Sequence, residues 1–279
     1  MFFIKNTNAA ADYAVNLLRK DGEWMMIRLC NICMGFEGKS ILQDINLTVT
    51  RGETLVVIGP SGSGKSTLLR LIVGLLKPAA GEIWIKGQEI SCLSEDQLNK
   101  VRIGMGMVFQ YSALFDSMSV GENVAFGLRE HTDMPEAEIH KVVARNLRMV
   151  GLAGQEQVMP NQLSGGMKKR VSLARAIATK PEIMLYDEPT AGLDPIMSGT
   201  IDRLIMNAKR VLGVTSVVVT HHMSSAFKIA DRIAMIHGGR IIEVGTVEHI
   251  RQSENPVVQQ FILGLNSPGA YVRRRSQRQ

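Results

Sequence analysis

Apolar and polar positions along the chain first predict a pair of strands. Two runs, 27–36 and 41–50, read as strands that meet at a turn over Glu37-Gly38-Lys39. The second run is expected to bury one face, because its apolar residues recur at odd positions: Ile41, Ile45, Leu47 and Val49. This opening segment therefore predicts an antiparallel pair of strands.

Further along, short apolar runs alternate with helical patterns. Continuous apolar runs are typical of strands buried on both faces, and they occur at 53–59, 102–110, 182–188 and 215–222. Strand patterns also cover 81–90 and 231–245, the latter a hairpin that turns at Gly238-Gly239. Helices are predicted at about 65–76 and 197–212. This order favours an α/β fold with a mostly parallel sheet and an antiparallel β edge.

Residues 111–180 have a different pattern and predict a helical subdomain inserted into the sheet. Its clearest helix has Asp133 as the expected N-cap, Pro135 in the first turn and Gly151 at its end. One stripe of this helix carries Ile139, Val142, Val143, Asn146 and Val150. We expect an N-terminal lead at 1–25, a main domain at 26–250 that contains the insertion, and a C-terminal extension at 251–279.

Composition places the chain among globular proteins. It has 279 residues, 45% of them hydrophobic and 21% charged. A run of about 18 apolar residues is missing, and the N-terminus lacks the apolar region of a signal peptide, so we expect a cytoplasmic protein. The net charge of +6 owes much to four arginines in the last seven residues: Arg273, Arg274, Arg275 and Arg278. This tail is either solvated or in contact with anionic lipid head groups.

The cysteine pair Cys30-x-x-Cys33 invites a metal-binding or redox interpretation. It lies in an expected strand, where residues three apart point to opposite faces. The sequence shows neither a second such pair nor a nearby histidine to complete a ligand set. A structural role is therefore favoured, as expected in a reducing compartment.

The strongest chemical motif is GPSGSGKST, which follows one apolar run and opens a helix. Glycines such as Gly62 and Gly64 let successive N–H groups point at phosphate oxygens, beside the positive end of the helix. Lys65 is expected on the β and γ oxygens, Ser66 on Mg²⁺, and Thr67 at the α phosphate. The predicted nucleotide-binding residues here are Gly59, Ser61, Gly62, Ser63, Gly64, Lys65, Ser66 and Thr67.

Further polar residues end other apolar runs. Asp187 and Glu188 are adjacent, and the simplest division gives Asp187 to Mg²⁺ and Glu188 to an attacking water as general base. Gln110 can coordinate Mg²⁺ weakly or orient water, and His221 can contact a γ-phosphate. Each of these two could also be a simple polar cap. All four fall at carboxyl ends of strands, where open α/β sheets bind ligands.

A second phosphate-binding element appears at Ser164-Gly165-Gly166, which opens another helix-like run. It combines a hydroxyl, free N–H groups and a helix dipole. Since the first loop already wraps its own nucleotide, this second element is expected to serve the phosphates of another molecule.

In the order and spacing of its motifs, the chain resembles the ATP-binding subunit of ATP-binding-cassette (ABC) transporters over about 26–250. The motifs that carry this resemblance are GPSGSGKST, Gln110, LSGG, Asp187-Glu188, GLD and His221. The resemblance implies a P-loop NTPase (RecA-like) fold and two subunits that meet head to tail around two MgATP. It also places Phe36 on the adenine and Asp194 at the dimer seam, with Ser164, Gly165 and Gly166 acting in trans. Two departures are Met167, where Gln is commonest, and His222, where Asp usually follows the switch histidine. The second leaves open which histidine faces the phosphate.

Several stretches, among them 109–132, QLSGGMKKR and NPVVQQFILG, are similar to ATPases of Mla-type, Mce-associated systems. That resemblance implies transport of phospholipid or other hydrophobic cargo at the cytoplasmic face of the inner membrane. The implied partners are an Mla E-type permease, an Mce-type lipid-binding subunit and a small accessory subunit. The apolar residues of 111–132 would form either a groove for the permease or subdomain core: Ala113, Leu114, Phe115, Met118 and Phe126.

Three rival functions are weaker. A transporter ATPase for another cargo, such as an amino acid, a metal or a drug, would carry the same motifs, because the ATPase does not touch cargo. A soluble ABC-type ATPase acting on nucleic acid would carry a long coiled-coil insertion or tandem copies of the domain, which 279 residues do not hold. A P-loop kinase of small molecules would need neither LSGG nor a dimer seam.

Overall fold

The computed structural model describes residues 19–20 and 23–264. Most of the predicted lead and the whole arginine-rich tail lie outside the described residues. The strands are β1 (Arg19–Lys20), β2 (Glu23–Phe36), β3 (Lys39–Thr50), β4 (Thr54–Ile58), β5 (Ala80–Ile85), β6 (Gln88–Glu89), β7 (Met105–Val108), β8 (Ile183–Asp187), β9 (Thr215–Thr220), β10 (Arg232–His237) and β11 (Arg240–Thr246). The helices are α2 (Lys65–Ile72), α3 (Glu95–Arg102), α4 (Val120–His131), α5 (Glu136–Met149), α6 (Gly165–Ala178), α7 (Pro195–Leu212), α8 (Met223–Ile229), α9 (Val247–Arg251) and α10 (Pro256–Leu263), with a 3₁₀ turn, η1, at Pro160–Gln162.

The central sheet runs in the order β11-β10-β4-β9-β8-β7, and neighbouring strands from β10 to β7 are parallel. Strands β4, β8 and β9 are buried along their whole length, as their continuous apolar runs predict. Strand β11 adds the antiparallel edge through the predicted turn at Gly238-Gly239, where both residues have positive φ. The carboxyl ends of β4, β7, β8 and β9 therefore share one edge.

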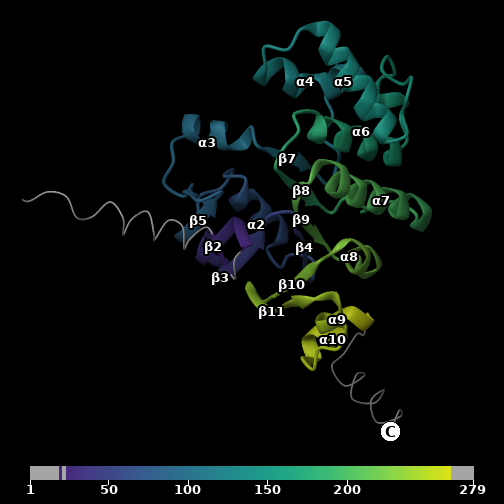
Figure 1. Cartoon of the computed structure of the whole chain (residues 1–279). Coiled ribbons are helices and arrows are strands. Elements are labelled where there is room, and N and C mark those ends of the chain that lie inside the picture. Colours follow the sequence, from purple (N-terminus) through teal and green to yellow (C-terminus); the bar gives the residue numbers. More distant parts are fainter. Residues whose placement is uncertain (1–18, 21–22, 265–279) are drawn as a thin grey trace, which may run out of the picture.

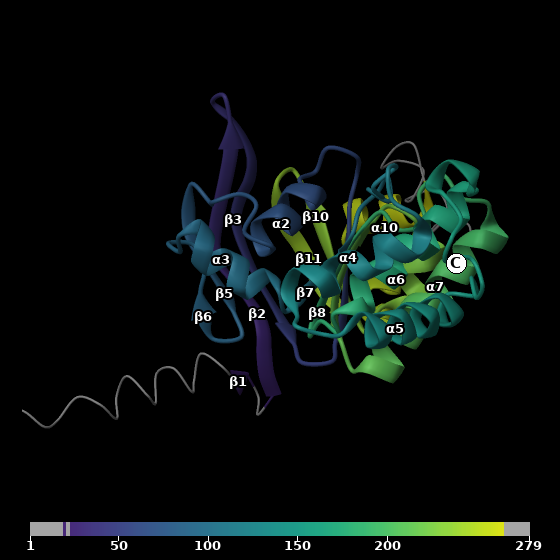
Figure 2. The same cartoon turned by 90° about the horizontal axis from the view of Figure 1, so that it is seen from above.

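A second, antiparallel sheet contains β1, β2, β3, β5 and β6 and lies beside α2 (Figures 1 and 2). The pattern over 81–90 splits into β5 and β6 because Lys86 and Gly87 both adopt positive φ and form a turn. One hydrophobic core fills the space between this sheet, α2 and one face of the central sheet, and includes Leu55 and Val57. The alternate residues Val56 and Ile58 face the other core, beneath the helices from α4 onward.

Two bulges in the antiparallel pair of β2 and β3 interrupt the strict alternation of buried and exposed residues expected from the sequence. Asn31 in β2 and Asp44 in β3 adopt positive φ, and the Asn31 side-chain amide donates to the Asp44 carboxylate at 2.8 Å. The pairing register shifts around each of them, because each strand holds one extra residue there. In β3 the buried residues are consequently Leu42, Ile45, Leu47 and Val49. The prediction is confirmed for Ile45, Leu47 and Val49 and was wrong for Ile41, whose place Leu42 takes.

The bulge at Asn31 also changes the argument for the two cysteines. Leu29 and Ile32 are both buried although they lie three apart, so the strict alternation used for Cys30 and Cys33 does not hold. Both cysteines are half-buried and free, and the Cys33 sulfur accepts a hydrogen bond from the backbone N–H of Asp44 at 3.5 Å. Across the described residues, no group of three or more His, Cys, Asp or Glu side chains is placed to hold a metal ion.

Helices α4, α5 and α6 pack together at one end of the molecule, at the top of Figure 1. The buried stripe of α5 matches the prediction at Ile139, Val143, Asn146 and Val150. Its predicted N-cap was wrong, because the capping residue is Pro135 rather than Asp133. A proline disfavours helical backbone at the residue before it, so Met134 cannot belong to the first turn.

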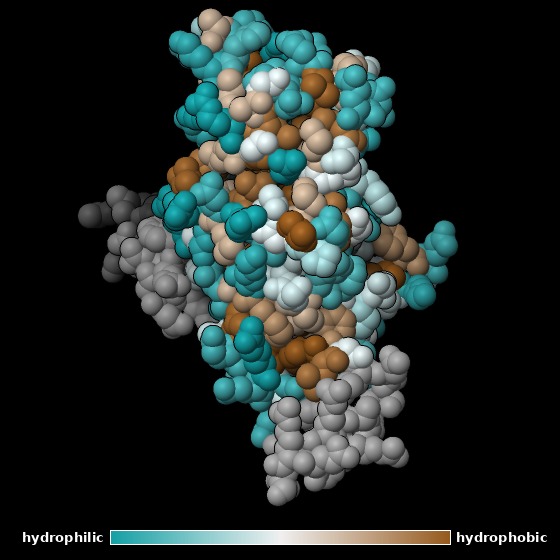
Figure 3. All heavy atoms as spheres, turned by 90° about the vertical axis from the view of Figure 1, so that its right-hand side faces the viewer, coloured by the Kyte–Doolittle hydropathy of each residue, from teal (hydrophilic) through white to brown (hydrophobic). Residues whose placement is uncertain are grey.

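Helix α2 ends at Ile72 and not near residue 76, because Gly74 adopts a φ of 71°. None of the helices in the described part of the chain has the length and apolarity needed to cross a bilayer. On the face shown in Figure 3, apolar side chains are interspersed with polar ones.

Candidate active site

The loop between β4 and α2 forms a cradle of backbone N–H groups. Gly59 and Gly64 have φ values of 154° and 99°. A Cβ on Gly59 would lie 2.3 Å from the Ile236 carbonyl oxygen, and one on Gly64 would lie 2.6 Å from a Leu42 methyl carbon. Helix α2 starts directly after Gly64 without a side-chain cap. Its first N–H groups are therefore available to an anion.

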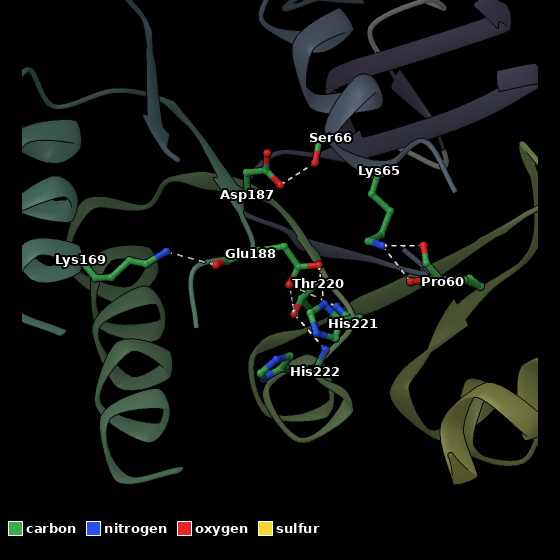
Figure 4. Close-up of polar contacts among 10 residues, drawn as sticks. Pro60, Lys65, Ser66, Lys169, Asp187, Glu188, Thr220, His221 and His222 are labelled. Atoms are coloured by element: carbon green, nitrogen blue, oxygen red, sulfur yellow. Dashed lines mark hydrogen bonds and ion pairs between the residues drawn. The ribbon is translucent and has the colours of Figure 1, made fainter. Parts of the chain in front are cut away.

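Lys65 places its ammonium group within this loop. Its Nζ donates to the carbonyl oxygens of Gly59 at 2.8 Å and Pro60 at 3.0 Å (Figure 4). Burial lowers the pKa of Lys65, and the nearby Glu188 and Asp187 carboxylates oppose that shift. The loop thus holds a largely buried cation that a phosphate oxygen could bind.

Asp187 ends β8 and faces the first turn of α2. Its Oδ1 accepts a hydrogen bond from the Ser66 hydroxyl at 2.9 Å. Burial raises the pKa of Asp187, the Ser66 hydrogen bond opposes the rise, and Glu188 adds to it. The hydroxyl, the carboxylate and the nearby Gln110 amide are oxygen donors of the kind that a hard divalent cation prefers. This donor set fits Mg²⁺, whose charge would also relieve the buried carboxylate.

Glu188 is held by three groups from one neighbouring segment. The Thr220 hydroxyl donates to its Oε2 at 3.1 Å, the backbone N–H of His221 lies 3.4 Å from the same oxygen, and His221 Nδ1 lies 2.8 Å from Oε1. Glu188 itself adopts a φ of 45°, an uncommon conformation for a residue with a side chain. An ionised Glu188 requires the proton of His221 to sit on Nδ1.

A cavity of about 410 Å³ joins these groups. It is lined by Phe36, Ile41, Ser61, Gly62, Gly64, Lys65, Ser66, Thr67, Gln110, Glu188 and His221. Gly59, Ser63 and Asp187 stand beside it within the same loop and strand end. Ser63 has a buried hydroxyl for which the described residues supply no hydrogen-bond partner. The cavity therefore gathers most of the predicted site residues from five separate segments of the chain.

The structure separates the two histidines. His221 lines the cavity and contacts Glu188, whereas His222 packs edge-on against the His221 ring at 4.4 Å. The backbone N–H of His222 donates to the Thr220 hydroxyl. Thr220 and Ile41 are site residues that sequence reasoning missed. Thr220 directly precedes the predicted switch histidine, so its position at a strand end was the available signal.

Four predicted residues lie away from this cavity: Ser164, Gly165, Gly166 and Asp194. Ser164 caps α6 by accepting from the backbone N–H of Met167, and Asp194 caps α7 by accepting from Ile196 and Met197. A Cβ on Gly166 would lie 2.5 Å from the Met197 methyl carbon, so the two helix starts adjoin. Ser164, Gly165 and Asp194 are exposed. These residues therefore lie on an exposed surface apart from the phosphate-binding loop at 59–64.

A cleft of about 590 Å³ lies between α3, β7, α4 and α6. Phe109, Ile103 and Met107 line its apolar part, and Arg175 lines it as well. Arg175 also donates to the Ala113 carbonyl oxygen and lies 5.7 Å from the Phe115 ring, which packs on Phe126 at 4.7 Å. Of the apolar residues predicted for a groove, Ala113 and Phe115 are exposed, while Leu114, Met118 and Phe126 are half-buried.

The sequence pattern of the ABC transporter family matches residues 42–191, which is more than half of the chain. The chain belongs to the ABC transporter family. Among its relatives, the intermembrane phospholipid transport system ATP-binding protein MlaF of Haemophilus influenzae is 44% identical over 239 residues, covering 86% of this chain and 90% of that protein. The probable ribonucleotide transport ATP-binding protein mkl of Mycobacterium tuberculosis is 40% identical over 238 residues, covering 85% of this chain and 66% of that protein.

Solved structures show the same fold. The dimeric ATP-binding cassette MJ0796, in a post-hydrolysis state bound to ADP and Pi, has a TM-score of 0.74 and 34% identity, and the match covers 80% of this chain and 99% of that one. The predicted P-loop ABC fold is therefore confirmed. This ABC protein is an ATP-binding, ATP-hydrolysing transporter subunit.

Proposed function

We propose that two copies of this ABC ATPase close head to tail around two MgATP and thereby drive a membrane permease. The observation that carries the proposal is the separation within one chain of two phosphate-binding elements. The cavity at Lys65 opens to solvent without Ser164, while Ser164 and Gly165 are exposed on a surface of their own. The relative MJ0796, described as dimeric in a post-hydrolysis state, supports this arrangement.

Within each closed site, the roles follow from the contacts around the cavity. Glu188 holds and deprotonates the attacking water, and the contacts from Thr220 and His221 keep its carboxylate oriented. Lys65 and His221 counter the charge that develops on the γ-phosphate. Mg²⁺, held by Ser66, Asp187 and Gln110, would supply further charge neutralisation of the phosphate oxygens. Phe36, half-exposed at the mouth of the cavity, stacks on the adenine.

The cargo and partners are proposed from the relatives and the sequence. The name of the Haemophilus influenzae relative favours phospholipid or another hydrophobic cargo moved between inner and outer membranes. An Mla E-type permease would dock in the cleft beside Phe109 and Phe115, at the cytoplasmic face of the inner membrane. An Mce-type lipid-binding subunit and a small accessory subunit would complete the system, and nucleic acid has no role. The mycobacterial relative, named for ribonucleotide transport, keeps another cargo as the alternative.

The Glu188→Gln variant tests this function. Glutamine keeps the size and the hydrogen-bond acceptor but cannot take a proton, so phosphate release should fall by about 10²–10⁴-fold while MgATP still binds. The full chain carrying the substitution should then form a stable dimer when ATP is added, as measured by light scattering. The same variant, purified from membranes with ATP present, should carry a multi-span permease, and mass spectrometry of that assembly should find phospholipid.

Wild-type rates of hydrolysis in Glu188→Gln would contradict its role as the base. Ribonucleotide in place of lipid in the trapped assembly would decide for the alternative cargo. An assembly without any membrane subunit would contradict the transport proposal as a whole. Glu130→Gln, on the exposed surface of α4, is the matched control and should hydrolyse ATP like the wild type.

A further inference from the structure

Lys169 is a buried cation that the proposed reaction leaves without a role. It lies on α6, four residues after Gly165, and is 6% exposed. Burial lowers its pKa, and the Asp187 and Glu188 carboxylates oppose that change. A buried ammonium group is costly unless hydrogen bonds satisfy it. Simple helix packing would be served better by an apolar side chain, so the partners of Lys169 indicate its purpose.

Those partners are backbone carbonyl groups of two other site segments. Lys169 Nζ donates to the carbonyl oxygen of Gln110, which follows β7, and to that of Glu188 at 3.4 Å. Figure 4 shows the side chain reaching from α6 to the backbone of Glu188. The Glu188 carbonyl also accepts from the backbone N–H of Ala191. One side chain thus connects α6 to the two residues proposed to orient water and metal.

The position of Lys169 links two different nucleotide sites. Gln110 and Glu188 act on the nucleotide bound by their own chain, whereas Ser164 and Gly165, one turn earlier on the same helix, face the nucleotide of the other copy. A helix moves as a rigid element over one turn, since its backbone hydrogen bonds hold each residue to the next turn. A displacement of Ser164-Gly165 toward the partner's phosphates therefore pulls on Gln110 and Glu188 through Lys169.

We propose that Lys169 is a positioning residue that makes hydrolysis in one nucleotide site depend on closure of the other. This inference rests on the proposed head-to-tail dimer. When α6 engages the second nucleotide, Lys169 sets the carbonyl groups of Gln110 and Glu188 in the arrangement that orients the general base. Without this connection, each site binds and hydrolyses ATP independently and more slowly.

The test measures phosphate release by the full chain as a function of ATP concentration. For the wild type, two coupled sites give a Hill coefficient that approaches about 2. Lys169→Met fills a similar space without hydrogen-bond donors, and should bring the coefficient to about 1 and lower kcat by about tenfold. Binding of MgATP to the loop at Lys65 should change by less than about twofold, because Lys169 does not line that cavity. A purely structural defect would change the nucleotide affinity together with the Hill coefficient, and not the coefficient alone.

Two further variants sharpen the result. Lys169→Arg keeps a charged donor group and should retain a coefficient well above 1. Lys168→Met is the matched control, since Lys168 is half-buried on the same helix and its side chain makes no hydrogen bond or ion pair within the described residues. It should behave like the wild type. If Lys169→Met does not fold, Lys169→Leu, which also lacks hydrogen-bond donors, should show the same loss of coupling.

An unchanged Hill coefficient in a folded Lys169→Met or Lys169→Leu protein would overturn the inference, and so would a wild-type coefficient of 1. The proposed dimer is tested separately, by mixing variants of Lys65 and Ser164 as described below. A dimer confirmed by that mixing, together with unchanged coupling in Lys169→Met, would remove only the role of Lys169.

Discussion

At the scale of single residues, the site places two adjacent carboxylates in different surroundings. Glu188 is surrounded by donors from Thr220 and His221, whereas Asp187 has the Ser66 hydroxyl and is otherwise buried. Burial raises the pKa of Asp187 above its ordinary value, so its charged form is disfavoured in the folded protein. Such a residue suits metal binding, because a cation reverses the penalty that burial imposes.

The first prediction concerns the loss of stability that results from burying the charged Asp187 carboxylate. In the absence of nucleotide and metal, Asp187→Asn should raise the melting temperature at pH 7 by about 2–4 °C, since the amide is neutral and still accepts from Ser66. Because the pKa of Asp187 is raised on folding, the penalty is present above that pKa. The penalty disappears as the pH falls below the ordinary aspartate pKa of 3.8. The difference in melting temperature should therefore vanish at about pH 3–4.

Thermal unfolding followed by circular dichroism across this pH range measures the effect. The matched control is Asp116→Asn, because Asp116 is exposed, and the two melting curves should then coincide. A lower melting temperature for Asp187→Asn at neutral pH would contradict the argument. The same variant should bind MgATP more weakly than the wild type.

At the scale of elements, one buried side chain attaches the loop over 112–119 to α4. Asn123 is fully buried, and its Oδ1 accepts from the backbone N–H of Phe115 at 2.8 Å. Its Nδ2 lies 3.0 Å from each of the carbonyl oxygens of Phe115, Met118 and Ser119. The loop over 112–119 precedes α4 and carries Phe115. The Asn123 side-chain amide therefore holds this loop against the first turn of the helix.

Asn123→Ala should accordingly destabilise the chain by about 2–3 kcal/mol, because buried N–H and carbonyl groups lose their partners. Hydrogen exchange should rise across 113–119 and stay nearly unchanged in the loop at 59–64, which belongs to a different segment. Exchange measured by mass spectrometry on the full chain tests both statements. Asn161→Ala, at an exposed position in η1, serves as the control. Unchanged exchange at 113–119 would show that Asn123 does not hold this loop.

At the scale of the whole molecule, the two elements proposed to bind phosphate lie on different parts of the chain. The loop at 59–64 follows the central sheet, whereas Ser164 begins α6, which packs with α4 and α5. A head-to-tail pair has two-fold symmetry, so each chain gives its Ser164 surface to the partner and receives the same surface in return.

This symmetry predicts complementation between two inactive chains. Lys65→Met should abolish phosphate binding in cis, and Ser164→Arg should block the surface that acts in trans. A dimer that contains one chain of each kind keeps one intact site, formed by the unaltered Lys65 loop and the unaltered Ser164. Half of the dimers are mixed and each has one of two sites, so independent sites would restore about a quarter of the wild-type rate. If Lys169 couples the sites, the intact site also lacks the closure of the second one, and the recovered rate should be about tenfold below that quarter.

Phosphate release before and after mixing measures this recovery. Each variant mixed with itself should remain inactive, which is the control for chain exchange alone. Full activity of Ser164→Arg by itself would show that the nucleotide site is complete within one chain. A mixture as inactive as its components would show that a dimer with one intact site cannot hydrolyse ATP.

The candidate site was largely accessible from the sequence. Four of its residues lie at the ends of segments with strong strand or helix patterns: Gly64, Lys65, Ser66 and Gln110. Their order along the chain therefore already predicts that they lie at one edge of the sheet. Strands β4, β8 and β9 were predicted for the same reason, because a segment buried on both faces must be apolar throughout. The local pattern failed where the backbone departs from regular geometry, as at the bulges of Asn31 and Asp44.

The sequence by itself determined the order of the elements, the phosphate-binding loop and the identity of the groups around it, since these depend on local periodicity and on contiguous motifs. Only the tertiary structure decided that Thr220 and His221 contact Glu188, that His221 and not His222 lines the cavity, and that Lys169 reaches Gln110 and Glu188. These contacts join residues far apart in the chain. Their distances depend on how helices and strands pack, and no periodic pattern records that packing.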